Sequence, residues 1–183
     1  ILEGYGLTET SPLVTLNPVE KIKIGSVGKP VNGVTIRIVN PDPQGIGEIA
    51  IRGLNVMKGY YRKPEETSKV IQESWFYSGD LGYIDRDGYL YISGRLKEVI
   101  VLGSGKNIFP DEIEKYYARS KYIKEVGIFL LEEGHTQSLK AVVVPDLETF
   151  KKNKQINIEE KIRWDIENIS KELSTYKRAM GFV

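Results

Sequence analysis

The chain has 183 residues, with 26 lysines and arginines against 25 aspartates and glutamates, so its formal net charge is +1. Such a balance gives no strong electrostatic field to attract nucleic acid or an acidic membrane surface. There is no cysteine, which excludes a disulfide, a thiolate metal site and a cysteine nucleophile within this sequence. No apolar run is long enough to span a bilayer and no signal-peptide pattern opens the chain, so we expect a cytoplasmic protein.

The first half of the sequence consists of short stretches with the alternation that is typical of β-strands. The predicted strands cover residues 34–39, 48–52, 81–84 and 89–93. Between the last two, Asp-Arg-Asp-Gly at 85–88 predicts a hairpin turn. Pro64 opens a short predicted helix, since proline is tolerated in a first helical turn. So many short strands indicate a small barrel or a distorted sheet.

The pattern changes near residue 94, where longer helices begin to alternate with strands. Strands are predicted over 98–102, 106–109, 126–131 and 139–144, and a helix over 110–119. A polar turn is expected over 132–138 and a solvated loop over 151–154. The last helix is expected to start after Asn157, an N-cap residue with Glu160 as its capping-box partner. The sequence therefore predicts an α+β fold with a domain boundary after residue 95.

The first motif of the chain, Gly-Tyr-Gly-Leu-Thr-Glu-Thr, begins at residue 4 and has the composition of a nucleotide site. Gly4 and Gly6 allow the backbone to approach a ligand closely, because neither carries a Cβ atom. Tyr5 offers a ring for stacking, Thr8 a hydroxyl donor, and Glu9 a hard carboxylate of the kind that Mg²⁺ prefers. Taken alone, the same seven residues would fit an ordinary glycine-containing turn.

Four further motifs follow in order and support the interpretation of the first motif as part of a nucleotide site. They are Gly-Glu-Ile-Ala-Ile-Arg-Gly from residue 47, Tyr-Ser-Gly-Asp from 77, Gly-Arg-Leu-Lys-Glu from 94, and Gly-Lys-Asn-Ile-Phe-Pro-Asp-Glu-Ile-Glu from 105. With this series the chain resembles, over nearly its whole length, the adenylate-forming superfamily of acyl-CoA synthetases, luciferases and peptide-synthetase adenylation domains. The resemblance implies that residues 1–95 are the β-rich, barrel-like end of a large AMP-binding domain. Residues 96–183 would then be a truncated, mobile C-terminal domain.

The resemblance also implies roles for individual residues. It assigns nucleotide binding to Gly4, Tyr5, Gly6, Thr8, Asp80 and Arg95. In the family the tyrosine stacks on adenine, the threonine contacts phosphate, the glutamate helps to hold Mg²⁺, and the aspartate and arginine reach the ribose. Thr8 and Glu9 are therefore candidate catalytic residues. On the residues alone, Asp80 could be a turn former and Arg95 a solvated arginine at a strand end. Ser78 stands where the family usually has threonine.

Two more features are assigned by the resemblance to the second half-reaction. Lys97 occupies the position at which the family pivots its C-terminal domain. Gly103, Gly105 and Lys106 belong to a loop that faces the pantetheine of CoA in the thioester-forming conformation. His135, the single histidine, lies in a polar turn, so we expect no histidine general base.

The implied function is an ATP- and Mg²⁺-dependent acid–thiol ligase. A carboxylate is converted to an acyl-AMP with release of pyrophosphate, and a thiol then attacks the mixed anhydride. Residues 94–114 favour long-chain fatty acid–CoA ligases, so the expected partners are ATP, a fatty acid and CoA, and not nucleic acid. Two alternatives stay open: an adenylation domain that loads a carrier protein, and a non-catalytic interaction module that keeps the fold.

The family's phosphate loop would precede Ile1 and its adenylation lysine would follow Val183. We therefore expect this chain to be a fragment that is inactive by itself, because losing one charge-stabilising group costs about 10²–10³ in rate. Peripheral membrane contact, through a region before Ile1, is a further expectation. The oligomeric state is not indicated.

Overall fold

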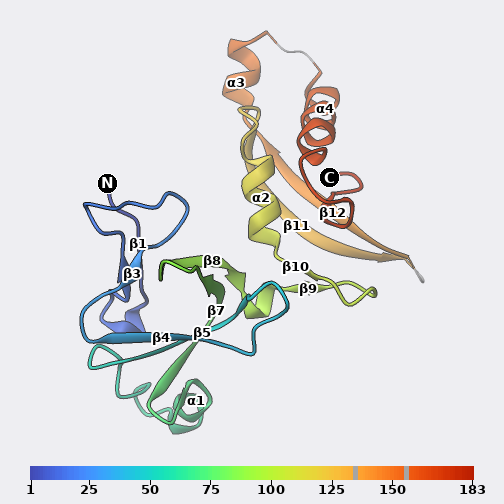
Figure 1. Cartoon of the computed structure of the whole chain (residues 1–183). Coiled ribbons are helices and arrows are strands. Elements are labelled where there is room, and N and C mark those ends of the chain that lie inside the picture. The colour runs from blue at the N-terminus through green and yellow to red at the C-terminus, as the bar shows by residue number, and fades with distance from the viewer. Residues whose placement is uncertain (134–135, 155–156) are drawn as a thin grey trace. The chain divides into compact units, whose positions relative to one another are not determined.

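A computed structural model describes residues 1–133, 136–154 and 157–183, and the chain divides into two compact units, Ile1–Lys97 and Glu98–Val183 (Figure 1). The fold is α+β, with open sheets and few helices, which confirms the predicted class. His135 and the centre of the expected turn over 132–138 lie outside the described residues. Within the described ranges, no helix has the length and apolar character needed to cross a membrane.

The first unit is built from two antiparallel sheets. A small sheet has the order β1 (Gly4–Tyr5), β2 (Thr15–Leu16), β3 (Lys29–Pro30). A five-stranded sheet has the order β4 (Val34–Val39), β5 (Gly47–Gly53), β7 (Trp75–Ile84), β6 (Ile71–Gln72), with β8 (Leu90–Arg95) also paired to β7. The helix α1 (Pro64–Val70) starts at the predicted proline. Alternate residues of β5, Ile49 and Ile51, reach the core formed with Val14, Phe76 and Leu90.

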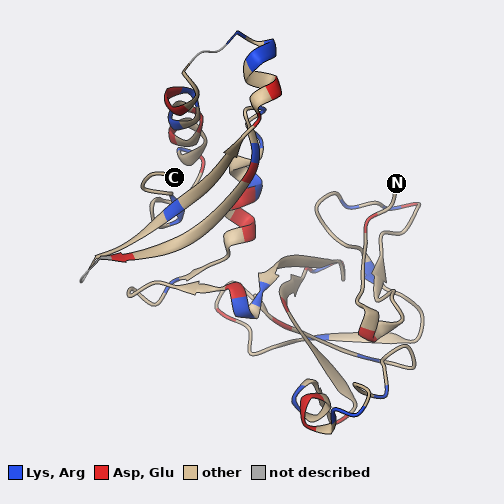
Figure 2. Ribbon diagram, turned by 180° about the vertical axis from the view of Figure 1, so that it is seen from behind, with Lys and Arg blue, Asp and Glu red and all other residues tan. Residues whose placement is uncertain are grey.

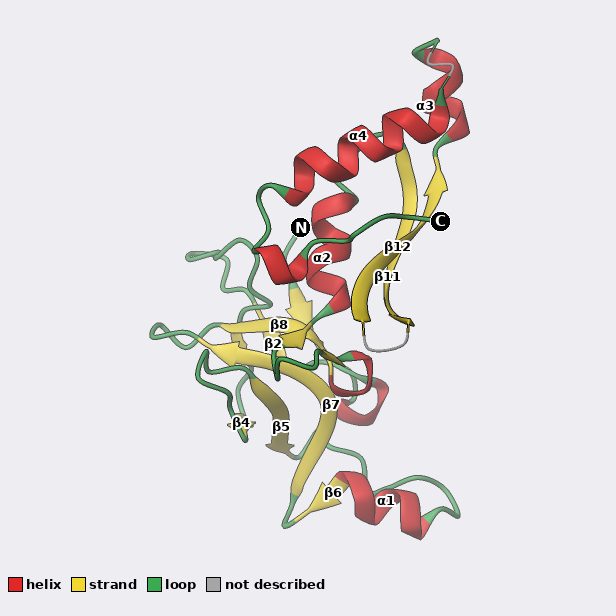
Figure 3. Cartoon of the chain, turned by 90° about the vertical axis from the view of Figure 1, so that its right-hand side faces the viewer, coloured by secondary structure: helices red, strands yellow, loops and turns green. Residues whose placement is uncertain are grey.

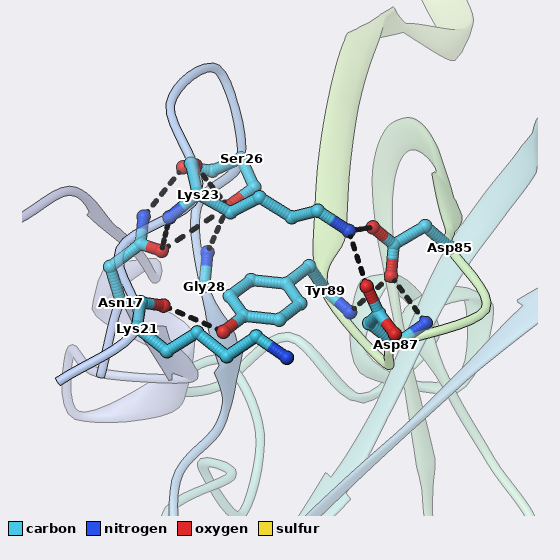
Figure 4. Close-up of polar contacts among 8 residues, drawn as sticks. All are labelled: Asn17, Lys21, Lys23, Ser26, Gly28, Asp85, Asp87 and Tyr89. Atoms are coloured by element: carbon cyan, nitrogen blue, oxygen red, sulfur yellow. Dashed lines mark hydrogen bonds and ion pairs between the residues drawn. The ribbon is translucent and has the colours of Figure 1, made fainter.

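The β7–β8 hairpin turns where the sequence predicts, and its turn is anchored to a distant loop. Asp85 Oδ1 accepts the N–H groups of Asp87 and Tyr89, each at 2.9 Å. Lys23 reaches across from the loop that precedes β3 and pairs with both Asp85 and Asp87 (Figure 4). Hydrogen bonding to Lys23 lowers the pKa of both carboxyl groups. The Tyr89 hydroxyl donates to the Lys21 carbonyl at 2.6 Å, so the loop and the hairpin are joined at two points.

The second unit packs helices on a long hairpin. The strands β11 (Ile123–Glu133) and β12 (Thr136–Pro145) are antiparallel, and the helices α2 (Pro110–Tyr117) and α4 (Ile158–Ser170) lie against them (Figure 3). The core they share contains Ile113, Tyr117, Ile128, Ala141, Ile162 and Ile166. A short hairpin of β9 (Ile100–Val101) and β10 (Asn107–Ile108) precedes α2. At the end of the chain, Phe182 forms a parallel bridge with Ala141.

Two local expectations need correction in this unit. The loop expected over 151–154 is wrong in its first half, because α3 (Leu147–Lys152) ends there. Its signals are an N-cap, Asp146, which accepts the Thr149 N–H at 2.9 Å, and the buried Phe150. At α4 the Asn157 cap is confirmed, with the Glu160 N–H at 3.0 Å from Oδ1. The Glu160 carboxylate, however, accepts from the Asn157 side-chain amide and not from its backbone.

Candidate functional site

Three of the predicted nucleotide-site residues meet in the first unit. The Tyr5 hydroxyl donates to Asp80 Oδ2 at 2.6 Å, although the two residues are 75 positions apart. Arg95 Nε lies 3.3 Å from Asp80 Oδ1. Asp80 and Arg95 are directly opposite on β7 and β8, while Tyr5 comes from β1. Two sheets therefore converge on one carboxylate.

The Asp80 carboxylate is buried and its backbone is fixed. Asp80 is 6% exposed. Its N–H donates to Ser78 Oγ at 3.1 Å, and the Ser78 hydroxyl donates to the Ile49 carbonyl at 2.8 Å. Glu48 Oε1 accepts the N–H of Gly79, which has a φ of 72° that favours glycine. Ser78 thus supplies a hydroxyl that threonine could supply equally, and Glu48 has a supporting role that the sequence did not reveal.

Burial raises the pKa of the Tyr5 phenol above its ordinary value of 10.0, and the hydrogen bond to Asp80 acts in the same direction. The folded state therefore favours the neutral phenol. Tyr5 contributes stability that is fully present below pH 10 and is lost as the pH rises above it, because the unfolded chain then releases the proton first.

Replacing Tyr5 by phenylalanine is expected to make the first unit less stable at pH 8, by about 1.5–3 kcal/mol for a hydrogen bond to a charged acceptor. The difference in the free energy of unfolding between the wild type and Tyr5→Phe should become smaller above pH 10, where only the wild type loses this contribution. Urea unfolding of both proteins, at pH 8 and at a pH above 10, measures this difference in the free energy of unfolding. Tyr61→Phe is the control, because that ring is 82% exposed. A gap that does not change with pH would contradict the assignment.

Gly4 and Gly6 are required by the packing of the chain itself. A Cβ atom on Gly4 would lie 2.8 Å from the Thr15 carbonyl oxygen, and one on Gly6 only 1.4 Å from that of Pro12. From the sequence, we expected these glycines to allow the close approach of a ligand. The structure gives each an internal reason: Gly4 lies against Thr15 of β2, and Gly6 lies against the backbone of Pro12, which precedes β2.

The turn after β1 is anchored by Thr10, for which the sequence predicted no individual role. Thr10 is fully buried, and its Oγ1 accepts the Leu7 N–H at 2.9 Å. The Thr10 carbonyl accepts from the Asn55 side-chain amide at 2.9 Å. These contacts fix the short 3₁₀ helix Thr8–Thr10 and leave Thr8 exposed.

Glu9 presents a half-exposed carboxylate. Its Oε1 accepts the Tyr60 hydroxyl at 3.0 Å, and its backbone carbonyl accepts the Met57 N–H at 2.8 Å. Burial, and then the bond to Glu9, raise the pKa of the Tyr60 phenol. The resemblance places Tyr60, with Gly47, Gly53 and Gly59, in a barrel motif with a mainly structural role, so its contact with Glu9 was not expected.

The donor set suits a magnesium ion that arrives with a nucleotide. In the part of the chain that the structure describes, no three His, Cys, Asp or Glu side chains gather as a metal site, and Glu9 is in no ion pair. Mg²⁺ is commonly held by one or two carboxylates together with substrate phosphates. A single available carboxylate therefore fits this mode and not a cage built by the protein alone.

Lys97 is the last residue of the first unit and is exposed, within the short 3₁₀ helix Leu96–Glu98. An exposed residue at a unit boundary can change its backbone torsions without disturbing a hydrophobic core.

The remaining predicted residues belong to the second unit, in the turn between β9 and β10. The Gly103 N–H donates to Gln137 Oε1 at 2.7 Å. Gly105 has a φ of 76°, and no described residue lies within 4 Å of the space that a Cβ would fill. Lys106 Nζ lies 4.2 Å from the centroid of the Tyr176 ring. The turn is thus held at one end by β12 and at the other by an aromatic ring near the end of the chain.

Comparison with known proteins gives the family. The sequence matches the family described as AMP-binding enzyme over residues 1–61. A 2-succinylbenzoate–CoA ligase of Oceanobacillus iheyensis is 41% identical over 132 residues, which are 70% of this chain and 27% of the ligase. A long-chain-fatty-acid–CoA ligase of Bacillus subtilis is 38% identical over 152 residues, covering 79% of this chain and 27% of the ligase.

Solved structures point to the same family as the sequence comparisons. The O-succinylbenzoate coenzyme A synthetase of Bacillus subtilis, in complex with ATP and a magnesium ion, superposes with a TM-score of 0.79 at 28% identity, covering 99% of this chain and 37% of that protein. The chain spans about a quarter of the length of the curated relatives it matches. Its ordered motifs, its fold and these relatives, which are acid–CoA ligases, agree with one another, and the chain belongs to the adenylate-forming superfamily of AMP-binding enzymes.

Proposed function

We propose that this chain supplies part of the ATP site of an acid–thiol ligase, which adenylates a long-chain fatty acid and transfers the acyl group to CoA. The observation that carries the proposal is the buried Asp80 carboxylate, which Tyr5 and Arg95 approach from two other strands. The first unit would be the end of the AMP-binding domain and the second a mobile C-terminal domain. The protein would act in the cytoplasm.

Asp80 has the capacity to bind a ribose. An ionised carboxylate offers about four lone-pair positions, and each of its two oxygens has one partner here. The free positions can accept the two ribose hydroxyls as charge-assisted hydrogen bonds. The Arg95 side chain is 64% exposed, so its guanidinium can also reach the sugar, and the Tyr5 ring lies beside them for the base.

Thr8 and Glu9 would serve the phosphates. The exposed Thr8 hydroxyl can donate to a phosphate oxygen, and the Glu9 carboxylate can hold Mg²⁺. When bound, this ion would neutralise charge on the phosphates during adenylation. Tyr60 fixes one oxygen of Glu9, which leaves the other free for the metal.

The second half-reaction would use the boundary and the second unit. Lys97 would be the pivot, since it is exposed where the two units meet in sequence. Gly103, Gly105 and Lys106 would then approach the pantetheine of CoA. Gly105 has a left-handed backbone conformation and no Cβ atom, so its main chain can come close to a ligand.

The acid is proposed from the relatives and from the motifs after residue 94. Both a long-chain-fatty-acid ligase and a 2-succinylbenzoate ligase align with this chain at about 40% identity. A fatty acid is preferred here because the alignment with the long-chain-fatty-acid ligase extends over more of the chain, 79% against 70%. An aromatic acid is the rival substrate.

Carboxylate-dependent ATP–pyrophosphate exchange by the full-length protein tests the proposal. The panel should contain long-chain, short-chain and aromatic acids, and CoA should be added in a second step. We expect exchange with long-chain acids, thioester formation with CoA, and no turnover by the 183-residue chain alone. Exchange with 2-succinylbenzoate only would change the assigned substrate from a fatty acid to this aromatic acid. A folded full-length protein without exchange on any acid would overturn the ligase assignment.

A further inference from the structure

The loop between β5 and α1 borders a cavity that the proposed site does not use. The cavity has a volume of about 590 Å³, is open to solvent, and is lined in part by Lys58, Arg62 and Lys63. In Figure 2 the ribbon of this loop is blue where it leads into the red first turn of α1. Three cations within six consecutive residues make this rim of the cavity positive.

These cations have no carboxylate partner. Across residues 1–133, 136–154 and 157–183, none of the three forms an ion pair. All three are exposed, and Arg62 Cζ lies 5.1 Å from the centroid of the Tyr61 ring. The carboxylates of Glu65 and Glu66 follow in α1 but do not line the cavity. The positive charge is therefore available to an external anion.

The loop is held in one conformation before any ligand arrives. Thr67 Oγ1 accepts the Tyr60 N–H at 2.9 Å and donates to the Lys63 carbonyl at 2.8 Å. A Cβ atom on Gly59 would lie 2.7 Å from Thr67 Cγ2, so the loop passes tightly over the helix. A preformed loop loses less entropy on binding than a flexible one, which favours a ligand site.

The cavity is also connected to Glu9. Tyr60 lines it, and the Tyr60 hydroxyl donates to the Glu9 carboxylate at 3.0 Å. One side chain thus touches both the proposed magnesium ligand and the positive cavity. An anion in the cavity would lie next to the place where the phosphates of a nucleotide are expected.

We propose that this cavity binds an inorganic oxyanion of the pyrophosphate class, held by Lys58, Arg62 and Lys63. Pyrophosphate carries several negative charges on two linked phosphates, which matches three separate cations better than a single phosphate does. The choice of pyrophosphate over phosphate rests on the proposed adenylation reaction, which releases it. Binding in the cavity does not depend on that reaction, and the site would hold the product as it leaves.

The test uses the 183-residue chain labelled with ¹⁵N and titrated with sodium pyrophosphate, without ATP or metal. We expect the amide signals of residues 58–63 to shift in a saturable manner, with weaker binding at higher salt. Arg62→Gln should weaken binding at least about tenfold. Because Arg62 has a φ of 55°, Lys58→Gln/Lys63→Gln is a second variant that leaves this strained residue in place, and the same loss is expected.

The matched control is Lys151→Gln/Lys152→Gln, which removes two exposed cations from α3 in the second unit and should bind like the wild type. Equal affinity in the cavity variants, or no shift in the wild type at millimolar pyrophosphate, would overturn the site. Tighter binding of inorganic phosphate, followed through the same amide signals of residues 58–63, would overturn the choice of ligand. Since neither ATP nor an acid is present, these outcomes are independent of the exchange assay that tests adenylation.

Discussion

Gly6→Ala is expected to unfold the first unit and to leave the second unit folded. The added Cβ would lie 1.4 Å from the Pro12 carbonyl oxygen and 2.5 Å from the Pro12 carbonyl carbon, so it meets backbone and not a movable side chain. Overpacking against movable groups costs about 1–3 kcal/mol, and a backbone obstacle costs more. A loss of this size is a large part of the stability of a small domain.

The two units have separate hydrophobic cores, so their unfolding can be followed separately. Amide signals in each unit, recorded by NMR during heating, give the measurement. Gly127→Ala is the control, because this glycine lies in β11 and none of the residues that the structure describes comes within 4 Å of the added atom. If Gly6→Ala melts at the wild-type temperature, the close passage of residues 6 and 12 is not a property of the folded protein.

Gly6 shows why the residues of the candidate site could be predicted from the sequence but the contacts that hold them could not. The motif from residue 4 and Asp80 were assigned to a nucleotide site through the ordered series of five motifs in which the chain resembles the adenylate-forming superfamily. The contact that holds Gly6 against Pro12 depends on where the chain returns. Such returns are set by strand pairing over many residues, and a local pattern does not encode them.

Elements with local signals were predicted well. The strand over 34–39 coincides with β4, and Asn157 caps α4 as expected, because alternation and capping are properties of neighbouring residues. The hydrogen bond between Tyr60 and Glu9 joins positions 51 apart, and no local pattern near either residue predicts it. The helix α3 was missed because it is short and ends in the lysine-rich run 151–154, which by itself indicates a solvated loop.

Asp80→Asn is expected to weaken the binding of AMP by about ten- to a hundredfold, since hydrogen bonds to a charged group contribute about 1.5–3 kcal/mol. Asparagine keeps the shape of the side chain and one acceptor oxygen for the Tyr5 hydroxyl. It removes the negative charge that strengthens hydrogen bonds from ribose hydroxyls and that faces Arg95 at 3.3 Å. Calorimetric titration of AMP into the chain and into the full-length protein measures the effect.

The control is Glu48→Gln, which removes a neighbouring negative charge but keeps an acceptor for the Gly79 N–H. We expect Glu48→Gln to bind AMP like the wild type, because Glu48 only supports the turn. Equal losses in both variants would mean that the overall negative potential matters and not a specific carboxylate. Wild-type affinity in Asp80→Asn would place the nucleotide elsewhere, and the meeting of Tyr5, Asp80 and Arg95 would then be a device that joins two sheets.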